Sequence, residues 1–187
     1  MFLTSLKLFM STLRNITDSN SVTATVSLGS NLSYLNRLPR EIVLAAMEDL
    51  GRISIESQSS SLYLSEPIDC PPDVGDFINA AMVLRLSSKT SAQELLGVLQ
   101  GIEADYGRQR GARQNQARSL DIDIISYENQ ELESKNLILP HPRAIERKFV
   151  LMPLAEICPE MLLPGQLLNI AQLLAGLPRT ENVRLLS

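Results

Sequence analysis

Residues 120–126 read LDIDIIS and begin with a strict alternation of apolar and acidic side chains. A β-strand points successive side chains to opposite faces, so this pattern predicts a strand whose apolar side chains share one face. Asp121 and Asp123 then share the other face, with Cα atoms roughly 6.5 to 7 Å apart. The stretch predicts a strand with one face in the core and two carboxylates side by side at its beginning.

The segments around this strand predict an alternation of strands and helices. A 3.6-residue period indicates a helix over 35–50, with Pro39 in its first turn and Gly51 as its C-terminal cap. The other predicted elements are strands over 23–28, 53–64 and 77–86, a helix from the Ser91–Glu94 capping box to Gly107, a hairpin over 129–139 and a helix over 149–157. The order β-α-β-β-α-β predicts an α+β fold, a ferredoxin-like sandwich with a mostly antiparallel sheet and helices packed on it.

The composition is that of an ordinary globular chain. Of 187 residues, 44% are apolar and 20% are charged, so we expect one domain over residues 22–187, preceded by a disordered leader over residues 1–21. The net charge of -4 gives no general attraction to nucleic acid or to an anionic membrane, and no apolar run is long enough to span one. Two cysteines without a CxxC motif are typical of a cytoplasmic protein, and a monomer is the expected state.

An arginine-rich segment precedes the acidic strand. Residues 108–118 read RQRGARQNQAR, with four arginines and no acidic or large apolar residue, which predicts a solvated loop. Guanidinium groups bind phosphate oxygens bidentately, and a carboxylate pair is a common protein contribution to a Mg²⁺ site that phosphates complete. Together these features favour phosphoryl-group transfer. The alternative is a solvated strand face whose acids only pair with the arginines.

Other candidate sites carry less sequence information. None of the four lysines follows a glycine, so a Walker phosphate loop is excluded. Residues 27–31, SLGSN, form a candidate phosphate-binding turn between a strand and a helix, with a purely structural turn as the alternative. His141 is the only histidine, which excludes a histidine-based metal cluster. The positive charges that follow it, on Arg143, Arg147 and Lys148, indicate either a second phosphate contact or a solvated turn.

Six motifs occur in the order typical of one enzyme family. They are SLGSNL at 27–32, LYLSEP at 62–67, FINAAM at 77–82, IEADYGRQR at 102–110, RSLDIDI at 118–124 and LPHPRAIERKFVLMPLAEICP at 139–159. Over this length the chain resembles the 6-hydroxymethyl-7,8-dihydropterin pyrophosphokinases, also called 2-amino-4-hydroxy-6-hydroxymethyldihydropteridine diphosphokinases. The resemblance implies mobile catalytic loops on a ferredoxin-like fold. It also implies transfer of pyrophosphate from ATP to the pterin alcohol in folate biosynthesis, giving AMP and the pterin diphosphate.

The resemblance further implies a site for ATP and metal. Two Mg²⁺ ions, held by Asp121 and Asp123, would bridge the ATP phosphates. The catalytic residues that it implies are Arg108, Arg110, Arg118, Asp121 and Asp123. The residues that it places on ATP are Glu103 near the base, Arg110, Arg118, His141 and Arg147.

A pterin pocket is the second implied site. Its residues are Ser65, Ile68, Phe77, Asn79 and Phe149. The two phenylalanines would stack on the flat ring, and the asparagine would hydrogen bond its polar edge. Without the resemblance, both phenylalanines would be interpreted as core residues and the asparagine as the end of a strand.

Two departures from the family pattern keep alternatives open. Family members commonly have a tryptophan in the arginine loop, where this chain has Asn115, and Phe77 replaces a tyrosine-like residue and so lacks its hydroxyl. A catalytically impaired homologue is therefore one alternative. The other is a non-enzymatic ferredoxin-like domain that binds nucleotide or RNA. An RNA-binding sheet needs aromatic side chains interleaved on its strands, whereas this chain has four Phe and four Tyr, none of them clustered.

Overall fold

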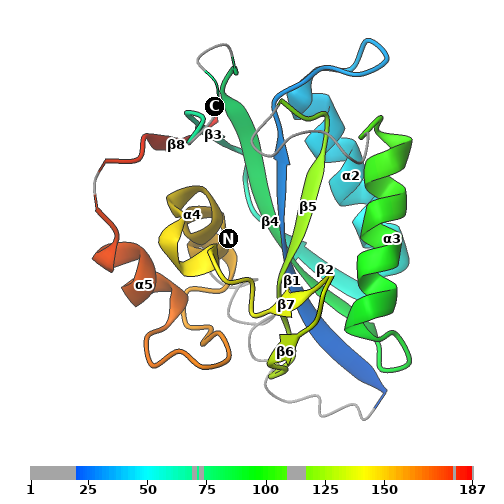
Figure 1. The fold of residues 1–187 in the computed structure, drawn as a ribbon, viewed down its shortest axis with the longest axis vertical. Coiled ribbons are helices and arrows are strands. Elements are labelled where there is room, and N and C mark those ends of the chain that lie inside the picture. The colour runs from blue at the N-terminus through cyan, green and yellow to red at the C-terminus, as the bar shows by residue number, and fades with distance from the viewer. Residues whose placement is uncertain (1–19, 69–70, 72–73, 109–116, 179, 187) are drawn as a thin grey trace, which may run out of the picture.

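The computed structural model describes residues 20–68, 71, 74–108, 117–178 and 180–186 (Figure 1). The strands of its main sheet are β1 (Ser21–Ser30), β2 (Glu56–Ser59), β3 (Tyr63–Ser65), β4 (Phe77–Ser87), β5 (Asp121–Tyr127) and β8 (Val183–Leu185). They lie in the order β5-β1-β4-β3-β8, with β2 paired to β4 as well. Every pairing between them is antiparallel.

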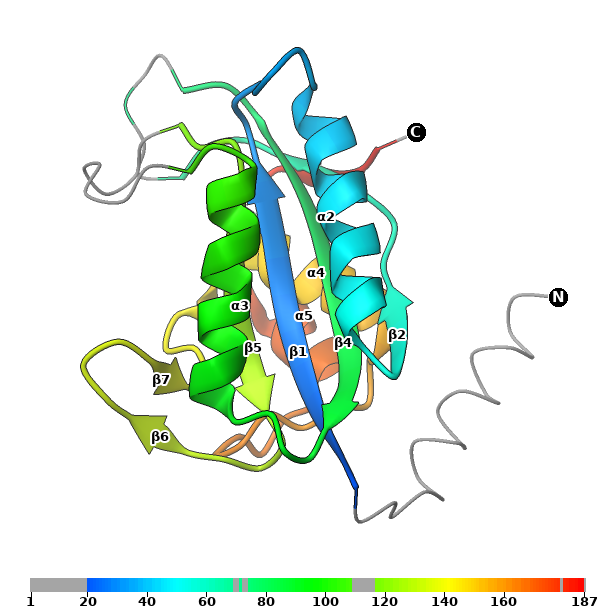
Figure 2. The ribbon, with the colours of Figure 1, turned by 90° about the vertical axis from the view of Figure 1, so that its right-hand side faces the viewer.

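Two helices connect the strands across one face of this sheet. Helix α2 (Pro39–Ile53) leads from β1 to β2, and α3 (Ala92–Asp105) leads from β4 to β5. Each connection passes over a strand that lies between the two it joins, and Figure 2 shows both helices in front of the sheet. Two interleaved split β-α-β units are the ferredoxin-like arrangement, so the predicted fold class is confirmed.

The first core lies between this helical layer and the sheet. Leu28, Met82 and Ile122 point from three neighbouring strands toward the helices, where they meet Leu50 and Leu95. All five side chains are buried. The predicted alternation of residues 120–126 is confirmed, because the apolar positions of β5 are buried while its two aspartates are only partly covered.

A second core covers only part of the opposite face. Helix α4 (Lys148–Ile157) and α5 (Ile170–Gly176) pack on Ala81, Val83 and Ile125, in the halves of β4 and β5 that carry apolar side chains on this face. Figure 1 shows these two helices on the side of the sheet away from α2 and α3. The halves that carry polar side chains are left without a helix above them, and this gap in the helical layer is where the candidate site lies.

Several boundaries differ from those that the sequence predicts. The strand predicted to end before Gly29 continues to Ser30. Residues 35 and 36 have φ values of 46° and 63°, which are not helical, so α2 begins only at Pro39. Gly51 is not its cap, because the helix continues to Ile53 and Ser54 follows as the cap residue.

The segment predicted as one strand over 53–64 is divided in two. Ser60 causes the interruption, because its side-chain Oγ accepts the hydrogen bond from the Ala81 backbone N–H at 2.9 Å. The Ser60 N–H still donates to the Ala81 carbonyl at 2.9 Å. A side-chain oxygen thus replaces a backbone carbonyl in the ladder, a substitution typical of serine.

The remaining predicted helices and strands that lie among the described residues are confirmed. The Ser91–Glu94 capping box opens α3, and Gly107 follows its end with φ +82° and the Tyr34 ring packed where a Cβ would stand. The predicted hairpin consists of β6 (Leu132–Glu133) and β7 (Ile138–Leu139), and a short 3₁₀ helix η1 (Ala144–Glu146) precedes α4. The sequence left α5 and β8 without a prediction.

Some predictions fall on residues that the structure does not describe. These are residues 109–116 of the predicted arginine-rich loop, with Arg110 and Asn115 among them, and the leader up to residue 19. Ser21, at the end of the predicted leader, is the first residue of β1. Within the described part of the chain, no helix is long and apolar enough to cross a membrane.

Candidate active site

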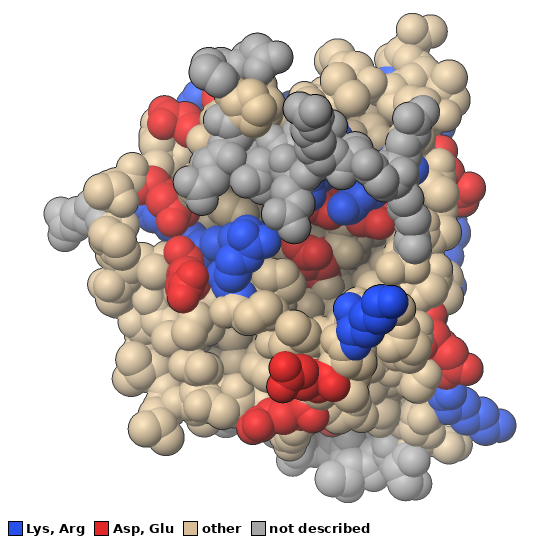
Figure 3. Space-filling model, in the orientation of Figure 1, with Lys and Arg blue, Asp and Glu red and all other residues tan. Residues whose placement is uncertain are grey.

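The exposed polar part of the sheet is the floor of a cleft of about 340 Å³, a volume in the range of small-molecule sites. Figure 3 shows acidic and basic side chains around a hollow on this face. The lining includes Arg108, Arg118, Asp121, Asp123, His141 and Arg147 from the predicted ATP and metal residues. It also includes all five predicted pterin residues, which are Ser65, Ile68, Phe77, Asn79 and Phe149.

Strand register brings the two predicted sites onto one row of the sheet. Asn79 on β4 is paired with Gly29 on β1, and Gly29 is paired in turn with Asp121 on β5. Paired residues of antiparallel strands point to the same face, so the asparagine and the aspartate stand on the cleft floor on either side of a glycine. The next row pairs Ser27 with Asp123.

Gly29 keeps the floor open between these two side chains. A Cβ at this position would lie 3.6 Å from Asn79 Oδ1 and 3.9 Å from the Phe77 ring. Any longer side chain would fill the space that separates the carboxylate from the amide.

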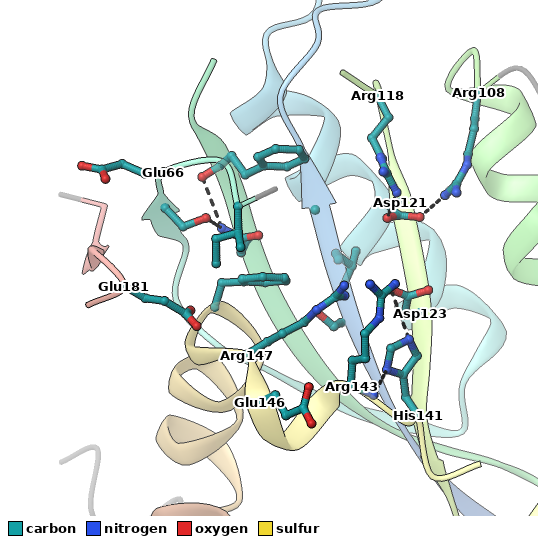
Figure 4. Close-up of a pocket in the computed structure, with 18 residues that line it drawn as sticks. Glu66, Arg108, Arg118, Asp121, Asp123, His141, Arg143, Glu146, Arg147 and Glu181 are labelled. Carbon is teal, nitrogen blue, oxygen red and sulfur yellow. Dashed lines mark hydrogen bonds and ion pairs between the residues drawn. The ribbon is translucent and has the colours of Figure 1, made fainter. Parts of the chain in front are cut away.

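Two arginines converge on Asp121 at one end of the cleft. Arg108 Nη1 donates both to Glu103 and to Asp121 Oδ1, and Arg118 Nη1 donates to Asp121 Oδ2. Figure 4 shows both guanidinium groups pointing at this one carboxylate. The two arginines therefore balance the negative charge of Asp121 in the absence of a ligand.

Glu103 lies beneath this cluster and does not line the cleft. Its side chain, on α3, is 9% exposed and accepts a hydrogen bond from the Ile122 backbone N–H at 2.7 Å. Burial raises the pKa of Glu103 to about 7, although the hydrogen bond from Ile122 and the charge of Arg108 act in the opposite direction. These contacts support Arg108 and β5.

Asp123 is more open than Asp121. Its side chain is 43% exposed, but it faces the cleft and the residues around it partly exclude water. This desolvation, followed by the charge of Asp121, raises the pKa of Asp123 to about 6. The strand thus carries one carboxylate paired with arginines and one that lacks comparable pairing among the described residues.

His141 lies beside Asp123, with 4.0 Å between Nε2 and the nearer carboxylate oxygen. Burial, with the charges of Arg147 and Arg143, lowers the pKa of His141 to about 4. The imidazole is therefore neutral at pH 7, and the contact is not an ion pair there.

Four charged side chains of the cleft wall are not among the site residues that the resemblance implies, and one of them is Glu66 from the chain after β3. Arg143 and Glu146 come from the η1 segment, and Glu181 comes from the chain after α5. Arg147 at the start of α4 stacks over Phe149, with 5.4 Å from its guanidinium carbon to the ring centre. Of the positive charges after His141, Arg143 and Arg147 thus line the cleft, whereas Lys148 Nζ donates to the Glu181 carbonyl.

The floor at the opposite end of the cleft is built from neutral groups. The amide of Asn79, which is 2% exposed, donates to Ser65 Oγ at 2.9 Å and to the Phe77 carbonyl at 3.2 Å. Both amide hydrogens are thus committed to the protein, and no described residue donates to Asn79 Oδ1. This oxygen is available to a donor on a ligand.

Asn31 connects the loops on the two sides of the cleft. Its Oδ1 accepts the Arg118 backbone N–H at 2.8 Å, and its Nδ2 donates to the Gly75 carbonyl at 3.2 Å. The segment at 27–31 is not the predicted turn, since Ser27 to Ser30 belong to β1 and Asn31 holds loop backbone.

The carboxylates of the cleft suit Mg²⁺ better than a metal ion whose ligands would all be protein side chains. No group of three or more His, Cys, Asp or Glu side chains converges among the described residues. Two carboxylates on a strand, with arginines beside them, suit an ion that uses few protein ligands and completes its shell with phosphate and water.

Comparisons with known proteins show which family this chain belongs to. The family model for 7,8-dihydro-6-hydroxymethylpterin-pyrophosphokinase (HPPK) matches residues 25–159. The chain belongs to this family. HPPK enzymes transfer pyrophosphate from ATP to hydroxymethyldihydropterin in folate biosynthesis, so this chain is an ATP-dependent pyrophosphokinase. The result decides against the RNA-binding alternative.

Individual relatives of this chain agree with the family match. It is 37% identical over 146 residues to a 2-amino-4-hydroxy-6-hydroxymethyldihydropteridine pyrophosphokinase of Haemophilus influenzae, covering 77% of this chain and 86% of the relative. A Pseudomonas aeruginosa protein of the same name is 37% identical over 156 residues, covering 82% and 90%. Among solved structures, a variant of Plasmodium falciparum HPPK-DHPS crystallised with pterin and p-hydroxybenzoate is similar with a TM-score of 0.65 and 14% identity. The match covers 85% of this chain and 44% of that one, and it supports the fold alone.

Proposed function

We propose that the pyrophosphoryl transfer takes place in this cleft, with ATP phosphates at the Asp121 end and the pterin at the Asn79 end. The observation that carries the proposal is the row Asn79, Gly29, Asp121 across three strands. It places a neutral recognition group and a charged group on one floor, with open space over the glycine. Two substrates bound at these positions would meet above Gly29.

At the charged end, Asp121 and Asp123 would hold two Mg²⁺ ions together with the ATP phosphates. Mg²⁺ bound there would neutralise phosphate charge and help deprotonate the pterin hydroxyl. Arg108 and Arg118 already point into this part of the cleft. When triphosphate binds, their guanidinium groups would move from the Asp121 carboxylate to phosphate oxygens, which they match bidentately. Arg110, by resemblance, would join them.

Arg147 and His141 would contact the nucleotide from the other wall. Arg147 keeps a positive charge in the cleft and is held over Phe149. His141 is neutral, so it would donate or accept a single hydrogen bond without adding charge. A histidine whose pKa is about 4 is also a poor general base at neutral pH. Catalysis would therefore rest on in-line placement and charge neutralisation.

At the neutral end, Phe77 and Phe149 would stack on the two faces of the pterin. Asn79 Oδ1 would accept a hydrogen bond from an N–H group of the ring edge, and the backbone near Ser65 and Ile68 would complete the pocket. The support is that both phenylalanines and Asn79 line one cleft.

The test replaces one carboxylate without changing its shape. Asp123→Asn should reduce AMP formation from ATP and 6-hydroxymethyl-7,8-dihydropterin by at least about 10²-fold, the scale of a lost charge-stabilising group. Wild-type AMP formation should require both the pterin and Mg²⁺. Glu133→Gln, an exposed carboxylate on β6, is the matched control and should keep full activity.

Near-normal turnover by Asp123→Asn would remove the metal assignment. A wild-type chain that binds ATP without releasing AMP would instead be the catalytically impaired homologue.

We also propose that residues 22–187 act as one monomeric domain in the cytoplasm. Both apolar cores pack on the same sheet, and the buried Cys158 is a free thiol, as expected in a reducing compartment. Light scattering of the full chain tests the monomer.

A further inference from the structure

The chain after α5 returns to the cleft although it lies outside the region matched by the family model, which ends at residue 159. Strand β8 pairs with β3, bringing Val183 opposite Ser65, and Leu186 N donates to the Leu62 carbonyl at 2.8 Å. Ser65 is the residue whose Oγ accepts from Asn79. This returning segment, residues 180–186, thus adjoins the neutral end of the cleft.

Two residues at the start of this segment contact two different parts of the chain. Glu181 Oε2 accepts the Lys148 backbone N–H at 2.9 Å, and Lys148 Nζ donates to the Glu181 carbonyl at 3.1 Å. The next residue, Asn182, donates from Nδ2 to Glu66 at 2.9 Å. Consecutive residues therefore connect the first turn of α4 to the chain that follows β3. Figure 4 shows Glu66 and Glu181 on this side of the cleft, away from the aspartates of β5.

The N-terminus of helix α4 has no capping side chain of its own. Its N-cap residue, Arg147, makes no side-chain capping bond, and its first turn contains no acidic residue. The first N–H groups of a helix have no partner within the helix, and a negative charge near them is favourable. Glu181, which follows α5 in the chain, supplies both a hydrogen-bond acceptor and a negative charge at the N-terminus of α4.

Phe149 is the residue directly after Lys148 and lines the cleft. Any rotation of the first turn of α4 would therefore move its ring. The opposite ring, Phe77, is fixed in β4 beside Ser65. The separation of the two rings thus depends on how α4 is held relative to the sheet.

We propose that Glu181 is a positioning residue for the pterin. By capping α4 from the returning segment, it sets the distance between Phe149 and the sheet and so determines how well a flat heteroaromatic ring is held. The inference rests on the pterin site proposed above. It assigns a role in substrate recognition to a part of the chain beyond the family match.

The experiment measures binding of 6-hydroxymethyl-7,8-dihydropterin in the presence of a non-hydrolysable ATP analogue and Mg²⁺. Glu181→Ala should raise the pterin Kd by about tenfold, the scale of a lost helix cap, and leave the Kd of the ATP analogue unchanged. Glu181→Gln keeps an acceptor for Lys148 N and should bind pterin within about threefold of wild type. Arg184→Ala, an exposed position on β8, is the control for a general disturbance of the segment and should match wild type.

Each other result has a definite meaning. An unchanged pterin Kd in Glu181→Ala overturns the proposal. An equal loss in the alanine and glutamine variants also overturns it, because the carboxylate would then act by its charge on the ligand. Asn79→Ala separates this inference from the proposed function. If Asn79→Ala binds pterin normally, the pterin site itself is wrong; if it loses pterin while Glu181→Ala does not, only the positioning role fails.

Discussion

The two ends of the cleft are built from different kinds of interaction. At the proposed phosphate end, Arg108 and Arg118 satisfy Asp121 through charged hydrogen bonds. At the proposed pterin end, Asn79 is held by the neutral oxygens of Ser65 and Phe77. One end therefore contains opposite charges that neutralise each other, and the other contains an amide fixed by the sheet.

The two ends would therefore bind their ligands in different ways. The arginines must leave a carboxylate before they can bind phosphate, so binding there exchanges one set of ion pairs for another. The oxygen of Asn79 needs no such exchange, since only its amide hydrogens are used by the protein. The proposed pterin end is preorganised, which lowers the cost of binding, whereas the proposed phosphate end would be rearranged by its ligand.

The largest expected effect belongs to the phosphate end. Arg118→Ala should lower kcat/KM for ATP by roughly 10³-fold, the lower limit for an arginine that stabilises a transferring phosphoryl group. Arg118→Lys should recover only part of this loss, because an ammonium group lacks the planar fork. The measurement is steady-state AMP formation, with Arg52→Ala on the exposed side of α2 as the control. If kcat/KM of Arg118→Ala stays within tenfold of wild type, Arg118 does not stabilise the transferring phosphoryl group.

The next effect should be confined to the pterin end. Asn79→Ala should raise the pterin Kd by about 10- to 100-fold, as expected when a hydrogen bond of 1 to 3 kcal/mol is lost. The Kd of an ATP analogue should not change. Isothermal titration of each ligand measures both constants, and Asn129→Ala, in the exposed turn after β5, is the matched control. A parallel loss of ATP affinity would mean that the two ends are not independent.

The third effect is on stability and not on activity, and it tests how the buried acid beneath the proposed phosphate end ionises. The pKa of Glu103 is about 7 in the folded protein, above its ordinary value of 4.5. Its protonated form therefore favours folding, and this contribution is present below pH 4.5 and lost as the pH rises toward and through 7. Relative to Glu103→Gln, the wild-type free energy of unfolding should fall by at most roughly 1.4 kcal/mol per pH unit in that window.

Urea unfolding of both proteins at pH 5, 6, 7 and 8 measures this difference. Glu48→Gln, an exposed position on α2, should instead differ from wild type by a constant amount. Parallel curves for Glu103→Gln and wild type would show that Arg108 keeps the buried carboxylate fully charged.

Local patterns in the sequence predicted much of this molecule. Alternation over 120–126 placed Asp121 and Asp123 on one face, and the capping box at Ser91 located the start of α3. Family resemblance selected Phe77 and Asn79, whose sequence pattern alone indicates a core residue and a strand end. The boundaries failed where a side chain replaced a backbone group, as at Ser60, or where backbone angles were irregular, as in the turn before α2.

The strand and helix types, the pair of carboxylates and the arginines before them follow from sequence patterns, because they depend on neighbours within a few residues. Three other relations became visible only in the folded chain: Gly29 separates Asn79 from Asp121, Glu103 supports Arg108, and Glu181 caps a helix more than thirty residues earlier. These relations depend on strand register and on where the chain returns. Both are set by packing between distant segments, which a short sequence pattern does not record.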